Sequence, residues 1–164
     1  MNSQDIYIDN FRSSMQIAQR ALYAGIIVSI FSVFLVGGYF DGGKQYLPLL
    51  NLEIKSQYVK VPGLALIYFY CGAQCVYFVL LAKKNLENIN NDGVLESLFL
   101  YPSTLLANVW WQTFLAPILL GIWYQIFMLS GIVSSLAVST ILGACVSFPF
   151  FAALKYGSRI KEKS

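Results

Sequence analysis

Two cysteines are the nearest approach in the chain to a reactive or metal-binding pair. Cys71 and Cys75 stand four residues apart in an apolar segment, so on a helix they would share one face. That spacing suits a soft metal ion such as zinc, but the sequence has no histidine and no third cysteine near the pair. Because a free cysteine behaves as a small buried hydrophobe, we expect both side chains to pack and predict no metal site.

The carboxylates are too few and too scattered to pair for acid–base catalysis. Asp41 and Glu53 belong to one polar segment, and Glu87, Asp92 and Glu96 belong to another. The sequence has no Gly-rich phosphate loop and no serine elbow. The long apolar segments carry no Asp, Glu, Lys or Arg, whereas proton relays and ion-coupled transporters usually need such groups within the membrane. We therefore expect neither an enzyme nor a cofactor-binding protein.

The composition predicts a protein of the lipid bilayer. The chain has 164 residues, of which 57% are apolar and only 12% charged, against about 25% charged in an ordinary soluble domain. A soluble domain of this length could not hide so much apolar surface. The net charge of +3 is too small to indicate direct binding of nucleic acid.

Four apolar stretches predict an all-α membrane protein, a single membrane domain over residues 1–164 with four transmembrane helices in a bundle. About twenty residues at a rise of 1.5 Å cover a hydrocarbon core of roughly 30 Å. Pro62 suits the first turn of the second span, Ser103 or Thr104 could cap the third, and Ser130-Gly131 suits a tight turn. The expected spans are 21–40, 62–82, 104–129 and 131–154.

The basic residues predict the orientation. Eight would lie on one side of the membrane, and only Lys44, Lys55 and Lys60 on the other. The positive-inside rule then places both termini, the 83–103 loop and the 155–164 tail in the cytoplasm. The eight are Arg12, Arg20, Lys83, Lys84, Lys155, Arg159, Lys161 and Lys163. The last six could form a basic face for a cytosolic protein partner, although solvated charges that only set topology are the simpler interpretation.

The 41–61 loop between the first two spans is the main outside element, and its pattern predicts a short β-rich loop. Residues 50–55 alternate apolar and polar side chains, and residues 58–61 could be their partner strand. No cleavable signal peptide is expected, because the first twenty residues lack an apolar core. Instead, an amphipathic helix is expected ahead of the first span, with Phe11, Met15, Ala18 and Leu22 on one face.

Small residues recur every four positions around the fourth span, so on a helix they would form one narrow stripe. In lipid, such stripes let two helix backbones approach closely. The stripe could pack within the chain, form the interface of a homo-oligomer, or line a pore with serine hydroxyls. Its members are Gly131, Ser135, Ser139, Gly143 and Ser147.

Amide side chains inside the spans need hydrogen-bond partners, since an unpaired amide in lipid is costly. Asn108 and Gln112 would share a face of the third span, Gln125 lies further along it, and Gln74 in the second span is a candidate partner. Bonds between helices are the simplest role and a water-filled path the alternative. Trp123 is expected at the outer membrane interface, as part of an aromatic belt.

Two families of small bacterial inner-membrane conflict proteins resemble the chain. Ala21-Leu22-Tyr23, the 89–95 segment and Pro102 resemble colicin A type immunity proteins, which have a longer outer segment between their last two spans. The short ectodomain 47–54 and the four spans resemble the membrane subunit of the Kiwa anti-phage system. The resemblance implies a non-catalytic subunit that senses, scaffolds or blocks another protein in antiviral defence, as a homo-oligomer. The alternatives are immunity to a pore-forming bacteriocin and an oligomeric ion-conducting pore.

Overall fold

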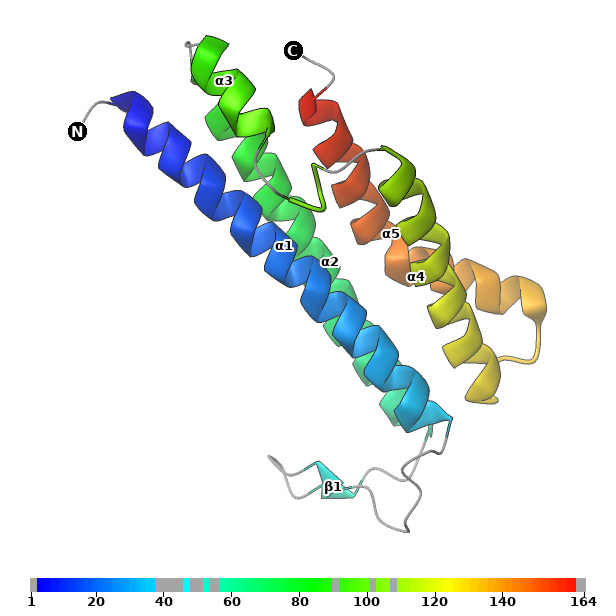
Figure 1. Ribbon diagram of the computed structural model, residues 1–164. Helices are drawn as coiled ribbons and strands as arrows, with labels where there is room; N and C mark the ends of the chain where they lie inside the picture. The colour runs from blue at the N-terminus through cyan, green and yellow to red at the C-terminus, as the bar shows by residue number, and fades with distance from the viewer. Residues whose placement is uncertain are drawn as a thin grey trace.

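The fold is a bundle of long helices, seen here in a computed structural model (Figure 1). The structure describes residues 3–37, 46–47, 52–53, 57–89, 92–100, 103–106 and 109–161. The helices are α1 (Ser3–Val36), α2 (Gln57–Leu86), α3 (Asp92–Phe99), α4 (Val109–Leu129) and α5 (Leu136–Lys161). The strands β1 (Tyr46–Leu47) and β2 (Leu52–Glu53) pair antiparallel, with Tyr46 opposite Glu53 and Leu47 opposite Leu52.

Three of the helices, α1, α2 and α5, are long and apolar enough to cross a membrane, as expected for a multi-pass protein. Only 28%, 28% and 33% of their most apolar stretches are buried in the bundle, so most of each stretch faces outward. The outward side chains are large and apolar, which suits contact with lipid tails rather than water. They include Ile27, Phe31, Phe34, Leu66, Ile67, Phe69, Ile141 and Phe148.

The α1–α2 pair is an antiparallel coiled coil (Figure 1). Buried positions on each helix are alternately four and three residues apart, which is the spacing of a coiled-coil seam. On α1 they run from Phe11 to Val36, and on α2 from Val61 to Leu86. The middle of the seam is made of small residues, among them Gly25, Ser29, Gly72 and Cys75, so the two backbones come close where lipid gives no hydrophobic push.

A tight turn joins α4 to α5. Gly131 has φ of 68°, a left-handed conformation that favours glycine. Further along α5, Gly143 packs on the backbone of α4, and a Cβ there would lie 3.1 Å from the amide nitrogen of Tyr124. The α4–α5 hairpin therefore depends on the absence of a side chain at Gly143.

Phe150 of α5 connects the two hairpins. A Cβ added to Gly25 would collide with the Phe150 ring. A Cβ added to Gly72 would lie 2.9 Å from Pro149 Cβ and 3.0 Å from the Phe150 ring, so α1 and α2 each have a glycine against that ring. Figure 1 shows α5 changing direction partway along its length. Pro149 lies inside α5, and an internal proline removes a helical hydrogen bond and bends the helix. The bend accompanies the entry of Phe150 between the two glycines.

The start of α1, the end of α2, α3 and the end of α5 lie at the same end of the bundle (Figure 1). We call it the basic end, because it carries the exposed Arg12, Lys84, Lys155 and Arg159. The β1–β2 pair and the α4–α5 turn lie toward the other end.

Three exposed residues lie at about the same position along the bundle, near the basic end. Arg20, Tyr77 and Lys155 are each five residues, or about 7.5 Å of helix, beyond the Gly25, Gly72 and Phe150 contact. All three side chains are exposed. Basic and tyrosine side chains gather where hydrocarbon meets headgroups, so we take this level as one edge of the apolar belt.

Several boundaries predicted from the sequence are wrong. The first span is not a separate 21–40 helix, because α1 begins at Ser3. Pro62 lies beyond the first turn, and residues 58–61 belong to α2 rather than to a strand, because α2 begins at Gln57. Residues 103 and 104 do not cap the helix expected as the third span, because that helix, α4, begins at Val109. Most of the expected β-rich loop falls outside the described residues.

The amphipathic start of α1 is confirmed. Phe11, Met15 and Ala18 are fully buried, and Leu22 is buried almost completely.

Candidate functional site

Polar and aromatic side chains from four helices meet at the centre of the bundle. The indole N–H of Trp123 on α4 donates to Ser29 Oγ on α1, at 3.0 Å. The Tyr68 hydroxyl on α2 donates to Ser147 Oγ on α5, at 3.4 Å. Both serines and both rings are fully buried. We call Ser29, Tyr68, Trp123, Ser147 and Phe150 the central cluster.

Ring contacts hold the central cluster together. The Tyr68 ring lies 4.9 Å from that of Trp123 and 4.7 Å from that of Phe150, both tilted. Such pairs add to the free energy of burial. Trp123 is therefore a core residue, and its predicted place at the outer interface is wrong. The centre of one bundle is filled by these rings, so a path for water or ions would have to form elsewhere.

The small-residue stripe of the fourth span is used within the chain. Ser139 and Ser147 are fully buried, and Gly143 is pressed on α4. The Ser139 hydroxyl donates to the carbonyl of Ser135, just before α5, at 3.1 Å, so it needs no partner from another helix. Gly131 and Ser135 precede α5 and are exposed. Internal packing is thus the role seen for the three helical members.

The four amides are not brought together as one described cluster. Gln74 is half-buried on α2, and Gln125 is exposed near the end of α4. Gln112 lies in the first turn of α4, but its side chain is outside the described set, as is the whole of Asn108. The predicted bonds of Gln74 to these amides therefore stay a prediction.

The cysteines pack separately. Cys75 is fully buried in the α1–α2 seam, Cys71 is half-buried beside it, and Cys145 is exposed on α5. Within the described residues, no three Cys, Asp or Glu side chains gather closely enough to hold a metal ion.

A cleft of about 260 Å³ opens at the basic end, between the ends of α2 and α5 and the start of α3. Its lining combines aliphatic side chains with two cations and one carboxylate. The lining residues are Lys83, Leu86, Glu87, Ile89, Leu95, Arg159 and Ile160. Because α2 and α5 run in the same direction past the central cluster, their basic last turns end side by side here.

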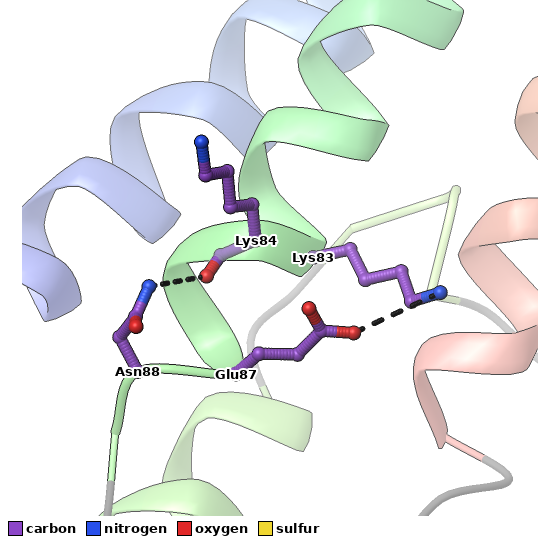
Figure 2. Close-up of polar contacts among 4 residues, drawn as sticks. All are labelled: Lys83, Lys84, Glu87 and Asn88. Carbon is purple, nitrogen blue, oxygen red and sulfur yellow. Dashed lines mark hydrogen bonds and ion pairs between the residues drawn. The ribbon is translucent and has the colours of Figure 1, made fainter.

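Figure 2 shows how the charged residues of α2 are divided. The Lys83 side chain extends toward α5, and Lys84 points away from it. Lys83 Nζ lies 3.8 Å from Oε1 of Glu87, which is four residues further along the chain, just past the end of α2. That pair is loose and partly exposed, so it contributes little, about 0.3 to 0.5 kcal/mol, and leaves Lys83 free to bind another anion.

The predicted basic face is therefore divided in two. Lys83 and Arg159 line the cleft, while Lys84 and Lys155 are exposed and do not line it. Lys161 ends α5 and its side chain is outside the described set, as is Lys163 altogether.

The cleft suits the binding of a small anionic group better than the binding of a cofactor. Its volume lies under the range of about 300–1,000 Å³ usual for sites that enclose drug-sized ligands. Lys83 and Arg159 can donate hydrogen bonds to an anion, and the leucine and isoleucine side chains can cover an attached apolar chain. Glu87 has no second carboxylate in the lining with which to share a proton.

Sequence reasoning missed the central cluster and the cleft. Ser29 and Tyr68 belong to no recognisable sequence motif. The one signal was the alternating four- and three-residue spacing of small and apolar residues from 11 to 36 and from 61 to 86, which could have indicated that these two helices pack along a seam. The partnership of Lys83 with Arg159 had no signal in the sequence, because it depends on how α5 packs on α2. Comparison with protein-family models, curated proteins and solved structures finds no match to the chain.

Proposed function

We propose that the chain is a non-catalytic, four-span subunit of a bacterial inner membrane, and that its basic end docks a cytosolic protein. The observation that carries this proposal is a packed cap beyond the apolar belt. We define the cap as the part of the bundle made of residues 3–19 of α1, the end of α2 with the turn after it (residues 83–89), α3, residues 103–106 and the last turn of α5. Its interior side chains are buried, including Phe11, Met15, Leu98, Leu105 and Ile160.

Membrane anchoring alone does not require such a cap. Gly157 illustrates how closely the cap is packed, because a Cβ there would collide with the Leu105 carbonyl oxygen. A surface supported by buried side chains suits recognition of another protein, since less order has to be gained on binding. The exposed Lys84 would favour an acidic partner surface.

Helix α4 is proposed as a span in addition to α1, α2 and α5, and it would be the third along the chain. Its 21 residues would extend about 31 Å, enough to cross the hydrocarbon core. It contains no charged residue, packs against α5 and α1, and exposes Phe114 and Ile118. Four spans leave both termini on one side, and the positive-inside rule makes that side the cytoplasm. The loop that carries β1 and β2 is then outside.

A role in antiviral defence is proposed on the resemblance to the Kiwa membrane subunit alone. The cap supports sensing or scaffolding, in which another protein binds the subunit from the cytoplasm. The pore alternative would need several chains, because Trp123, Tyr68 and Phe150 fill the centre of one bundle. Immunity to a bacteriocin would instead place recognition on the lipid-facing or outside surfaces.

Site-specific photo-cross-linking tests the docking proposal. A benzophenone side chain at Gln16 of α1 or at Ser97 of α3, both exposed on the cap, should capture the same cytosolic protein. The same probe at Ile118 of α4, which is exposed on the apolar belt, is the matched control and should not capture it. Lys84→Glu should reduce the yield and lower protection in a phage challenge. Different proteins at the two cap positions, or none, would contradict the proposal.

A further inference from the structure

We propose that the cleft at the basic end binds the phosphodiester headgroup of an anionic phospholipid, between Lys83 and Arg159. The inference rests on the membrane insertion proposed above and does not require the cytosolic partner. The cleft lies within the cap, but its lining does not include Gln16, Lys84 or Ser97, which belong to the proposed docking surface.

The depth of the cleft supports a lipid. Arg159 lies four residues beyond Lys155 on α5, or about 6 Å of helix rise. Lys83 lies six residues beyond Tyr77 on α2, or about 9 Å. Lys155 and Tyr77 mark the edge of the apolar belt, and the headgroup layer beyond it is roughly 5 to 7 Å thick on each side. The two cations therefore stand at the depth of the lipid phosphates or just beyond it.

The chemistry of the lining supports the same ligand. Two cations and one carboxylate give the cleft a net charge of +1, which one phosphodiester neutralises. Arg159 offers a planar fork of donors to two phosphate oxygens, and Lys83 offers a point charge opposite. Leu86, Leu95 and Ile160 provide the apolar wall that the start of an acyl chain requires. A free phosphate would use the cations but would leave that wall exposed.

Glu87 sets the direction in which the lipid enters. It lies one helical turn beyond Lys83, about 6 Å further from the membrane, and so at the cytoplasmic side of the cleft. An anion arriving from the cytoplasm meets the carboxylate first, whereas one arriving from the bilayer meets the two cations. A bilayer lipid is therefore favoured over a soluble anion.

Lipid retention in nanodiscs tests the proposal. The full chain is placed in nanodiscs of phosphatidylcholine and phosphatidylglycerol in equal parts. Native mass spectrometry then releases the protein from the disc and identifies, by mass, the lipids that stay bound to it. We expect the wild type to keep one phosphatidylglycerol in preference to phosphatidylcholine. In Lys83→Gln with Arg159→Gln, that preference should fall by about 30-fold, roughly fivefold for each basic side chain near an anionic surface.

The matched control removes the same charge elsewhere. Lys84→Gln with Lys155→Gln changes two exposed lysines that do not line the cleft, so the preference should be kept. Because all four side chains are at least partly exposed, both double variants should fold, which circular dichroism checks. Equal loss in the two variants, or equal retention of both lipids by the wild type, would overturn the proposal. In further discs that contain phosphatidylethanolamine, whose ammonium suits Glu87, a preference for that lipid would also overturn it. In a separate titration, binding of inorganic phosphate as tight as that of the lipid would do the same.

Discussion

Trp123→Ala should destabilise the bundle by about 3 to 5 kcal/mol, the cost usual for truncating a fully buried large aromatic side chain. The indole fills the middle of the central cluster, where it contacts Tyr68 and Phe127 and donates to Ser29. Its loss leaves a cavity among four helices and removes the hydrogen bond that Ser29 accepts from the indole. Reversible unfolding in mixed micelles, followed by circular dichroism, measures the change.

Two further variants separate the contribution of the Trp123 hydrogen bond from that of its buried ring. Trp123→Phe keeps a ring but removes the N–H, so it should cost much less, about 0.6 to 1.7 kcal/mol for the lost bond. Ile118→Ala on the same helix removes a lipid-facing side chain and should have little effect. If Trp123→Ala were as mild as Ile118→Ala, the indole would lie at an interface, as its sequence position first indicated.

Gly143→Leu should separate α4 from α5. Even a Cβ would lie 3.1 Å from the Tyr124 nitrogen and 3.4 Å from the Leu120 oxygen, and backbone atoms cannot move aside as a flexible side chain can. Overpacking typically costs about 1 to 3 kcal/mol, and the cost should lie at or above the upper limit here. Loss of thermal stability of the detergent-solubilised chain, at unchanged helix content, is the expected result.

Gly121→Leu is the matched control for Gly143→Leu. It makes the same substitution on the other helix of the hairpin, where an added Cβ meets nothing within 4 Å. It should be neutral or stabilising by up to about 1 kcal/mol, because leucine favours a helix more than glycine does. If the Gly143→Leu variant kept its stability but changed its oligomer size, the small-residue stripe would instead return to the role of a subunit interface.

The membrane character of the chain was predictable because it depends on composition and segment length, which are local properties. Three of the four expected spans correspond to helices long and apolar enough to cross a membrane. Their limits were less predictable, because a helix continues past the membrane edge wherever it finds tertiary contacts. Phe11 and Met15 show this for α1, since their burial in the cap extends the helix well beyond the apolar segment.

The sites were less predictable than the fold, for a physical reason. From the sequence alone, Trp123 could lie either at the membrane interface or in the core beside a hydrogen-bond acceptor, because an indole suits both environments. The structure shows the second role, with Ser29 as acceptor. The cleft required the ends of α2 and α5 to be adjacent, and that pairing depends on Phe150 fitting between Gly25 and Gly72. No spacing within one helix reveals such a contact.

Mapping the side of the membrane on which each segment lies tests the central claim most directly. In a chain with Cys71, Cys75 and Cys145 changed to alanine, single cysteines would be placed at Ser3, Ser134 and Ser164. With four spans, an impermeant maleimide applied to spheroplasts should label Ser134→Cys in the α4–α5 turn. It should label Ser3→Cys and Ser164→Cys only after lysis. Labelling of Ser164→Cys from outside, with Ser3→Cys protected, would leave three spans and contradict the account.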